Sequence, residues 1–373
     1  MKIVINALSA RIGGGQTYLK NLLAHLPKAP DLEVLVYAPA SVSLPEDRRI
    51  RRCSSWWPTR NPLLRTLWEK FALPRVLSRE CAQVLFCPGG VVATEVPRGC
   101  KTVTMFRNMI PFDPEAMKRV APGVQRLRNT ILRRVMLRSM AQADLTIFIS
   151  DHARRVIEGL VRVRNPVTIS HGIGAAFRTH GRSLSRPAWL PEGDYLLYVS
   201  RFDVYKHQFE VASAFAQLPP DLRRRYKLLF VGEADTASAE RVKELARQQG
   251  LADRILLVGP IAYAELPMAY HHAAVNLFAS SCENCPNILL EALGAGRPVL
   301  SSNVMPMPEF GGDAVAYFSP TDAASIADAL LRVLGDEARK VELAAAAVRR
   351  SADFDWATTS RATWHNIMST ASR

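Results

Sequence analysis

Two glutamates separated by seven residues, Glu283 and Glu291, flank the start of an apolar, helix-like run in the sequence CENCPNILLE. Carboxylates in this arrangement can accept hydrogen bonds from the hydroxyl groups of a bound polar ligand. The same stretch contains a CxxC, Cys282 and Cys285, which raises a zinc or redox site as a second interpretation. A structural zinc needs four ligands, and neither a second CxxC nor a suitably spaced histidine pair accompanies this one. The carboxylate interpretation is therefore favoured, and both thiols are expected to be buried packing groups.

Cations and backbone amides near these glutamates could hold a diphosphate. The run PNILLEALGAG predicts a helix, and the amides of Asn287 and Ile288 would lie in its first turn, where anions bind. In the earlier stretch YVSRFDVYKH, Arg201 follows a predicted strand and Lys206 lies in the next loop. Two cations placed in this way could clamp the phosphates from one side.

A glycine run, Gly13 to Gly15, separates the first predicted strand from the first predicted helix. Because glycine has no side chain, the backbone there could approach a ligand closely. The run matches neither GxGxxG nor a Walker A loop, so it does not identify a nucleotide site by itself.

The elements that must position these residues form two successive α/β blocks. Five strand-like runs alternate with helical patterns in the first block, and the pattern restarts at YLLYVSR. Strands separated by helices predict parallel sheets covered by helices. A stretch containing Pro, Gly and Ser at 178–194 is typical of a linker. We therefore expect an α/β fold of two domains, with a ligand cleft between them at the carboxyl ends of the strands.

Charge is distributed unevenly along the chain, whose 373 residues carry a formal net charge of +14. Residues 1–180 contain 28 Lys and Arg against 12 Asp and Glu, whereas the remaining residues contain 20 against 22. The basic excess therefore belongs to the first half. It predicts an anionic partner, such as a phospholipid surface, a nucleic acid or a phosphorylated acceptor.

Cysteine usage and hydropathy indicate the compartment. The six cysteines are scattered, which suits reduced thiols in a cytosolic protein, so no structural disulfide is expected. No apolar run approaches the ~18–20 residues that a membrane-spanning helix needs. We expect a cytoplasmic protein that is soluble or peripheral to a membrane.

A basic amphipathic helix is predicted in the stretch MKRVAPGVQRLRNTILRRVMLRSM. Here Arg126, Arg133, Arg134 and Arg138 alternate with apolar residues at nearly helical intervals. Such a helix could lie on anionic lipid, where a polyprenyl-diphosphate-linked sugar would be found. It could equally pack on the core and expose a solvated basic face. The pattern alone leaves both interpretations open.

Taken in order, the glycine-rich loop, VSRFDVYKH and LFASSCENCPNILLEALGAGRPVLSSN resemble the retaining, group 1 glycosyltransferases of family 4. The resemblance covers nearly the whole chain. It implies the GT-B fold, with two Rossmann-like α/β domains facing each other across a cleft. An acceptor domain over 1–180, a nucleotide-sugar domain over 191–350 and a final helix over 354–373 that crosses back to the first domain are expected.

The resemblance also implies roles for individual residues. Glu283 would contact hydroxyls of the donor sugar and Glu291 the ribose, while Arg201 and Lys206 would bind the diphosphate. The backbone groups expected to touch the donor are Gly14 and Gly15 at the diphosphate, Asn284, Asn287 and Ile288 at the phosphates and sugar, and Gly259 and Ile261 at the base. Many relatives have a histidine where this chain has Arg107, in RNMIP. Arginine cannot act as a general base at neutral pH, so a donor contact is the role expected for it.

The activity implied by the resemblance is a metal-independent transfer, with retention, from a nucleotide sugar, and no cofactor is expected. GDP-mannose or a related GDP-hexose is the expected donor. The expected acceptor is a polyprenyl-diphosphate-linked glycan of bacterial O-antigen or capsule synthesis, at the inner face of the cytoplasmic membrane and its anionic surface.

Two alternative functions are left open. A non-catalytic GT-B protein that binds glycan or serves in an assembly would also carry these motifs, and Arg107 keeps that possibility in view. A nucleic-acid-binding protein would explain the charge. It is less favoured, because no recognition motif is present and aromatic residues do not alternate with the basic runs, so no nucleic acid is expected as partner.

Overall fold

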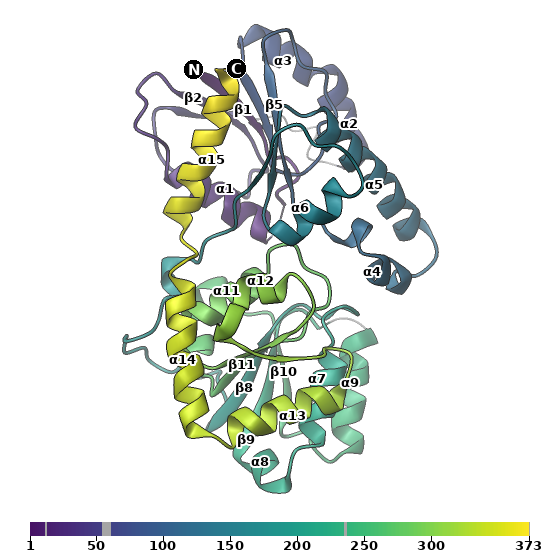
Figure 1. The fold of residues 1–373 in the computed structure, drawn as a ribbon, viewed down its shortest axis with the longest axis vertical. Helices are drawn as coiled ribbons and strands as arrows, with labels where there is room; N and C mark the ends of the chain where they lie inside the picture. Colours follow the sequence, from purple (N-terminus) through teal and green to yellow (C-terminus); the bar gives the residue numbers. More distant parts are fainter. Residues whose placement is uncertain (12, 54–60, 235–236, 373) are drawn as a thin grey trace. The chain divides into compact units, whose positions relative to one another are not determined.

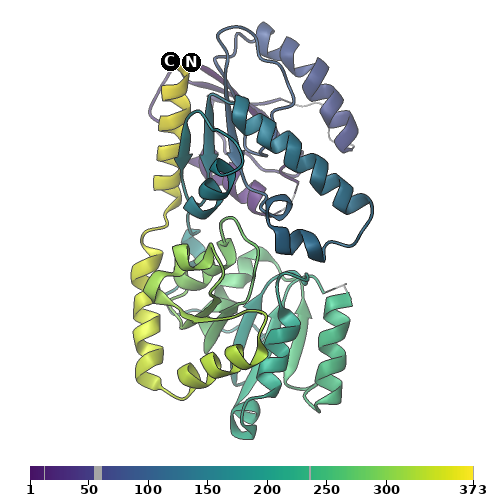
Figure 2. The same ribbon diagram turned by 45° about the vertical axis from the view of Figure 1, so that its right-hand side comes forward.

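The computed structural model describes residues 1–11, 13–53, 61–234 and 237–372. The chain divides into two compact units, unit 1 (Met1–Gly172 with Trp356–Arg373) and unit 2 (Ile173–Asp355). Each unit contains one parallel sheet with helices packed against it, as Figures 1 and 2 show. The predicted α/β organisation in two blocks is thus confirmed.

Unit 1 contains a seven-stranded sheet in the order β3-β2-β1-β4-β5-β6-β7, with every pair of neighbours parallel. The central strands are apolar on both faces because helices cover both sides. The strands are β1 (Lys2–Asn6), β2 (Glu33–Tyr37), β3 (Ile50–Cys53), β4 (Val84–Cys87), β5 (Lys101–Phe106), β6 (Leu145–Phe148) and β7 (Pro166–Thr168).

Helices α2, α4 and α6 of unit 1 begin at side-chain caps, that of α6 being Ser150, which accepts from the amide of Ala153. The Asn61 side chain accepts from the amide of Leu64 at the start of α2, and the Asp113 side chain does the same for Glu115 and Ala116 at the start of α4. The helices are α1 (Gly14–Ala24), α2 (Pro62–Phe71), α3 (Leu73–Arg79), α4 (Pro114–Arg119), α5 (Val124–Gln142), α6 (Asp151–Glu158), α15 (Trp356–Ala371) and the 3-10 helix η2 (Ile110–Phe112).

The last helix, α15, belongs to unit 1 and packs beside α1, although most of the chain separates the two helices in sequence. The indole nitrogen of Trp364 donates to the carbonyl of Leu22 at 2.9 Å. Close by, the Ser360 hydroxyl lies 3.2 Å from the carbonyl of Asn21. These contacts fix the helix that was expected over 354–373, which spans Trp356–Ala371.

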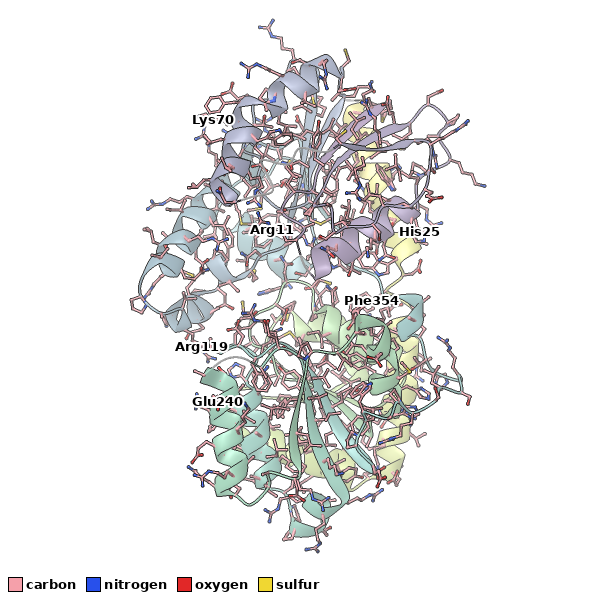
Figure 3. All side chains as sticks on the ribbon, turned by 180° about the vertical axis from the view of Figure 1, so that it is seen from behind. Arg11, His25, Lys70, Arg119, Glu240 and Phe354 are labelled. Carbon is pink, nitrogen blue, oxygen red and sulfur yellow. The ribbon has the colours of Figure 1, made fainter. Side chains whose placement is uncertain are left out.

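Helix α5 has a buried and an exposed apolar side. Met136 and Met140 are buried against the unit, whereas Leu127 and Ile131 are exposed. Neither of the two sequence interpretations describes the helix fully, because it packs on the core and also leaves apolar residues uncovered. Figure 3 draws the side chains, among them Arg11 in the segment after β1 and Lys70 on α2.

Unit 2 contains a six-stranded parallel sheet in the order β10-β9-β8-β11-β12-β13. The order reverses between β8 and β11, which places the two loops that follow these strands side by side. The strands are β8 (Asp194–Val199), β9 (Tyr226–Val231), β10 (Ile255–Gly259), β11 (Val275–Phe278), β12 (Val299–Ser302) and β13 (Ala316–Phe318).

Two groups of helices cover this sheet: α7 packs with α9 and α13, whereas α11 packs with α12 and α14. The helices are α7 (Gln208–Ala216), α8 (Pro220–Arg225), α9 (Ala237–Gln248), α10 (Leu266–His272), α11 (Asn287–Gly294), α12 (Met307–Gly311), α13 (Ala323–Leu334) and α14 (Glu337–Ser351), with the 3-10 helices η3 (Ala175–Phe177), η4 (Tyr263–Glu265) and η5 (Gly312–Ala314).

Unit 2 begins earlier than the boundary expected at 180. The ring of Phe177 packs against Tyr263 and Tyr270, with centroids 5.2 and 5.9 Å apart. The amide of Thr179 also donates to the carbonyl of Gly294 at 3.3 Å. These contacts attach residues 173–180 to the second unit, because burying an aromatic side chain outweighs the linker-like composition that follows it.

All six cysteines are free thiols in the structure. Across the described residues, no helix combines the length and the apolar character needed to cross a bilayer.

Candidate functional site

The residues singled out in unit 2 lie at the carboxyl ends of its strands. Arg201 and Lys206 follow β8, Gly259 ends β10, and Glu283 lies in the loop after β11. Ligands of open α/β sheets bind at this edge, beside the point where the strand order reverses. The topology therefore brings together Lys206 and Glu283, which are 77 residues apart in the sequence.

Lys206 and Glu283 form an ion pair through Nζ and Oε1. Their side chains are only 9% and 17% exposed, so water screens the pair poorly. The ammonium also lies 5.2 Å from the ring centroids of Tyr205 and Phe278. Carboxylate and aromatic faces together stabilise a charge that burial would otherwise disfavour. Two predicted residues are thus held in direct contact.

His207 ties together the loops that carry this pair. Its Nε2 lies 2.8 Å from the hydroxyl of Ser281, and the amide of Ser281 donates to the carbonyl of Tyr205 at 2.9 Å. His207 also has a φ of 52°, a left-handed conformation that side chains other than glycine rarely adopt. Such a conformation costs on the order of 1 kcal/mol and persists only where surrounding contacts enforce it.

Arg201 is placed differently from Lys206. Its side chain is 63% exposed, and its Nε lies 3.6 Å from a carboxylate oxygen of Glu233. The backbone of Arg201 is fixed, since its carbonyl accepts from Nε2 of Gln208 at 2.9 Å. An exposed pair of this kind contributes only ~0–1 kcal/mol, so a phosphate can replace the carboxylate at small cost.

Glu291, on α11, is held by two tyrosines. The hydroxyl of Tyr263 donates to Oε1 at 2.8 Å, and the hydroxyl of Tyr270 lies 3.4 Å from Oε2. Loss of water around the carboxyl raises the pKa of Glu291 to about 7, although both tyrosine hydrogen bonds lower it. At neutral pH the carboxyl is therefore close to half ionised.

Neither tyrosine was identified as a site residue from the sequence. Tyr263 is 53% exposed in η4, whereas Tyr270 is almost fully buried in α10. Tyr270 reads as an ordinary core residue. Tyr263 carried a usable signal, because it stands four residues after Gly259 in the loop already assigned to the base. Gly259 itself has a φ of 82°, and Ile261 lies between it and η4.

At the start of α11, one of the amides expected to bind phosphate already donates to the protein. Pro286 precedes the helix, and the amide of Asn287 donates to the carbonyl of Cys285 at 2.9 Å. The sequence assigns the amides of Asn287 and Ile288 to phosphate. The amide of Asn287 already has an acceptor within the protein. Asn284 and both thiols of the CxxC are buried, in line with packing thiols.

A second group of candidate residues lies in unit 1. Gly13 has a φ of 64° and precedes α1, so Gly14 and Gly15 form the first turn of that helix. A Cβ on Gly15 would lie 3.3 Å from the Cβ of Ala10 and 3.5 Å from Nη1 of Arg107. The Arg107 guanidinium lies 5.6 Å from the ring centroid of Tyr18. The glycine turn and Arg107 are therefore neighbours at the ends of β1 and β5.

Two family models match the sequence: "Glycosyl transferases group 1" over residues 185–350 and "Glycosyltransferase Family 4" over residues 12–176. The serotype-specific mannosyltransferase WbdA of Escherichia coli is 27% identical over 278 residues, which are 72% of this chain and 33% of WbdA. The O-antigen chain mannosyltransferase B of Escherichia coli is 27% identical over 162 residues, 43% of this chain and 42% of that protein. The chain spans about a third of the length of the WbdA relatives it matches.

Solved structures show the same fold at low sequence identity. Sucrose-phosphate synthase of Thermosynechococcus elongatus superposes with a TM-score of 0.76 at 19% identity, covering 99% of this chain and 98% of that one. WaaG, a glycosyltransferase involved in lipopolysaccharide biosynthesis, gives 0.73 at 16% identity, with 98% and 99% covered. Anabaena HepE, solved with UDP and glucose, gives 0.70 at 17% identity, with 99% and 100% covered.

Proposed function

Because this chain belongs to the group 1 glycosyltransferases and has the GT-B fold, we propose that it transfers a hexose from a nucleotide sugar to a glycan acceptor. The family and the fold expected from the sequence motifs are both confirmed. The activity is supported further by the mannosyltransferases among its relatives.

The observation that carries the proposal is the ion pair between Lys206 and Glu283, held at the strand ends near Glu291. In the transfer, the bond between the sugar's anomeric carbon and the diphosphate oxygen breaks, and the diphosphate leaves with both electrons. The anomeric carbon bonds to the acceptor oxygen, whose proton is released. Lys206 and Arg201 stabilise the negative charge that grows on the leaving diphosphate, aided by the dipole of α11.

Each carboxylate has a distinct role in this proposal. Glu283 accepts hydrogen bonds from hydroxyls of the donor sugar, and its ion pair with Lys206 aligns sugar and diphosphate. Glu291 accepts from the ribose. In unit 1, Gly14 and Gly15 let the backbone approach the diphosphate, and Arg107 supplies a further cation rather than a base. The reaction proceeds with retention and without a metal.

Mannose from GDP-mannose is the proposed donor group, since the first relatives are named as mannosyltransferases. One of these relatives, the O-antigen chain mannosyltransferase B, is named for the O-antigen, and WaaG is described as involved in lipopolysaccharide biosynthesis. We assign this chain to the same kind of pathway, with a polyprenyl-diphosphate-linked glycan as acceptor and a peripheral position at the inner face of the cytoplasmic membrane.

The proposal is tested by measuring thermal stabilisation and nucleotide release with GDP-, UDP-, ADP- and dTDP-sugars. A ligand at ~100-fold above its Kd stabilises the folded state by about 2.7 kcal/mol. We expect this stabilisation from sugar nucleotides of one nucleotide class. Glu283→Gln should abolish nucleoside diphosphate release, whereas Lys243→Ala, in an exposed pair on α9, should leave it intact.

The binding and release assays can contradict the proposal in two ways, and the product reports the stereochemistry. No stabilisation by any sugar nucleotide contradicts the proposal. Binding without release, in the presence of acceptor extracts, identifies a non-catalytic GT-B protein. The anomeric configuration of the product, read by NMR, decides between retention and inversion.

A further inference from the structure

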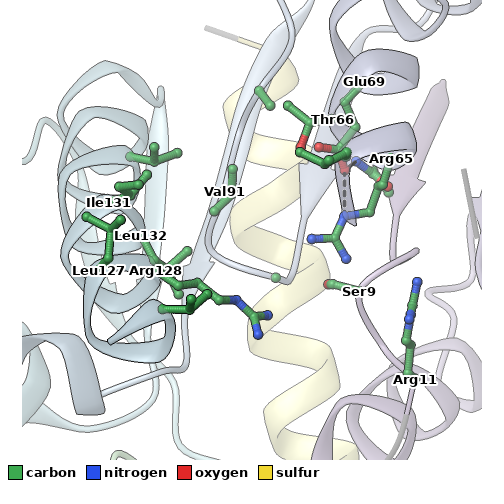
Figure 4. A pocket seen from close by; sticks show the side chains of 16 residues that line it. Ser9, Arg11, Arg65, Thr66, Glu69, Val91, Leu127, Arg128, Ile131 and Leu132 are labelled. Atoms are coloured by element: carbon green, nitrogen blue, oxygen red, sulfur yellow. Dashed lines mark hydrogen bonds and ion pairs between the residues drawn. The ribbon is translucent and has the colours of Figure 1, made fainter. Parts of the chain in front are cut away.

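Unit 1 contains a pocket of about 690 Å³ that none of the donor assignments uses. It lies between α2 and α5, above the loops that follow β1 and β4 (Figure 4). The apolar residues of α5 that line it are Val124, Leu127, Ile131, Leu132 and Val135, and Arg128 of the same helix lines it as well. Four of them recur at helical intervals, so they form one continuous apolar wall.

This wall is unusually exposed for apolar side chains. Val124 is 84% exposed, Leu127 62% and Ile131 52%, and Leu63 on the α2 side is 77% exposed. Leaving such side chains in water forgoes roughly 1.5–3 kcal/mol each relative to full burial. Contiguous exposed apolar surface of this kind marks a binding site for an apolar group.

The opposite end of the pocket is cationic. Arg11, Arg65 and Arg128 line it, and Figure 4 shows their side chains extending toward the region of Ser9 from different sides. The acidic side chain among the described lining residues is Glu69, whose pKa is raised by burial. The lining therefore contains three guanidiniums and one carboxyl.

Glu69 is already held by the protein. It accepts from Nδ2 of Asn6 at 2.9 Å, and its Oε1 lies 3.8 Å from Nε of Arg65. A planar guanidinium can bind a phosphate through two parallel hydrogen bonds. The cationic end thus fits a phosphate or diphosphate, while the apolar wall fits a hydrocarbon chain.

We propose that this pocket binds an amphiphile in which an apolar chain is attached to a phosphate or diphosphate, and that this amphiphile is the acceptor carrier. This assignment of an acceptor rests on the proposed function, whereas the binding itself does not. No aromatic ring occurs among the described lining residues, so these residues offer no stacking surface for a bare sugar or a nucleobase. The chain lies along α5, and the phosphates lie among the three arginines.

The test measures binding of farnesyl diphosphate, pyrophosphate and farnesol by calorimetry, without sugar nucleotide and below the micellar concentration. Farnesyl diphosphate is expected to bind about 10-fold or more tightly than either fragment, because both ends of the pocket contribute. Ile131→Asp should remove the advantage over pyrophosphate. Arg128→Gln should weaken the binding of farnesyl diphosphate and of pyrophosphate by similar factors.

Matched controls separate the pocket from general charge and hydrophobicity. Arg134→Gln changes an exposed arginine of α5 outside the lining, and Val341→Asp changes a valine of unit 2 that is 69% exposed. Both should bind farnesyl diphosphate as the unaltered protein does. Leu127→Asp serves as a second wall variant, and thermal melting of each variant confirms folding.

Several results would overturn the proposal. Equal affinities for farnesyl diphosphate and pyrophosphate would show that the apolar wall binds nothing. Equal losses in the control variants would show nonspecific attraction. Binding to phosphatidylglycerol vesicles without binding of farnesyl diphosphate would identify a membrane-contacting surface instead. Nucleotide release from sugar nucleotides, measured on the same preparation, reports the proposed function separately, so either can fail while the other stands.

Discussion

The hydroxyl of Tyr263 lies 2.8 Å from Oε1 of Glu291, and this contact links the loop after β10 to helix α11. Tyr263 is exposed, whereas the second tyrosine on this carboxyl, Tyr270, is buried. The carboxyl proposed to hold the ribose is therefore aligned before any ligand binds. Its pKa of about 7 makes its charge sensitive to pH in the physiological range.

Stability should fall with pH because of Glu291. Its pKa is about 7 in the folded chain and 4.5 for an ordinary glutamate, so between these values the folded state binds more protons than the unfolded state. The contribution to stability is present below pH 4.5, decreases as pH rises to about 7, and is then constant. The unaltered protein should therefore lose up to about 3 kcal/mol of unfolding free energy between pH 5 and pH 8 that the Glu291→Gln variant keeps. Denaturant unfolding at both pH values measures this, and a pH-independent difference would contradict it.

Donor binding should have the opposite pH dependence. The ionised carboxylate accepts hydrogen bonds from the ribose better than the protonated form, so affinity for a nucleotide sugar should rise up to 10-fold per pH unit below the pKa. Tyr263→Phe removes a hydrogen bond that lowers the pKa of Glu291 and should move the midpoint to higher pH. Titration calorimetry from pH 5.5 to 8.5 tests both variants. A Glu291→Gln profile as steep as that of the unaltered protein would assign the titration to another group.

The pair of Lys206 and Glu283 should be strongly coupled. Both side chains are largely buried, so removing one leaves the other without its counter-charge. A double-mutant cycle with Lys206→Ala and Glu283→Ala should give a coupling energy of about 1–3 kcal/mol in the free energy of unfolding. The exposed pair Lys243 and Glu240, 2.7 Å apart, should give about 0.5 kcal/mol or less. Similar values for the two cycles would show that burial does not strengthen the first pair.

The sequence sufficed to predict that the candidate residues follow the ends of buried strands. Arg201, Lys206 and Glu283 each follow an apolar run that reads as a buried strand, and parallel strands bring such positions to one edge. The direct contact between Lys206 and Glu283 depends on β8 and β11 being neighbours, which no local pattern states. Strand order follows from the packing of the whole sheet and becomes visible only in the structure.

Other features depend on contacts that have no sequence signature. Residues near Phe177 looked like the approach to a linker, yet its ring packs with two tyrosines of unit 2. The tyrosine hydroxyls on Glu291 come from η4 and α10, which no sequence pattern links to α11. For α5, periodicity predicted the helix but could not tell a core face from an uncovered one, because both require the same apolar spacing.

Gly232 should be the least replaceable glycine at the candidate site. It has a φ of 145°, and a Cβ there would lie 2.2 Å from the carbonyl oxygen of Ser200, just before Arg201. Its amide also donates to the carbonyl of Gly259 at 2.9 Å, which joins the ends of β9 and β10. Gly232→Ala must therefore displace backbone and should cost more than about 3 kcal/mol in unfolding free energy. Gly250→Ala, also at positive φ but with open space around it, should cost about 1 kcal/mol. Equal destabilisation of the two variants, measured by urea unfolding, would show that the strand ends can relax around a side chain at Gly232.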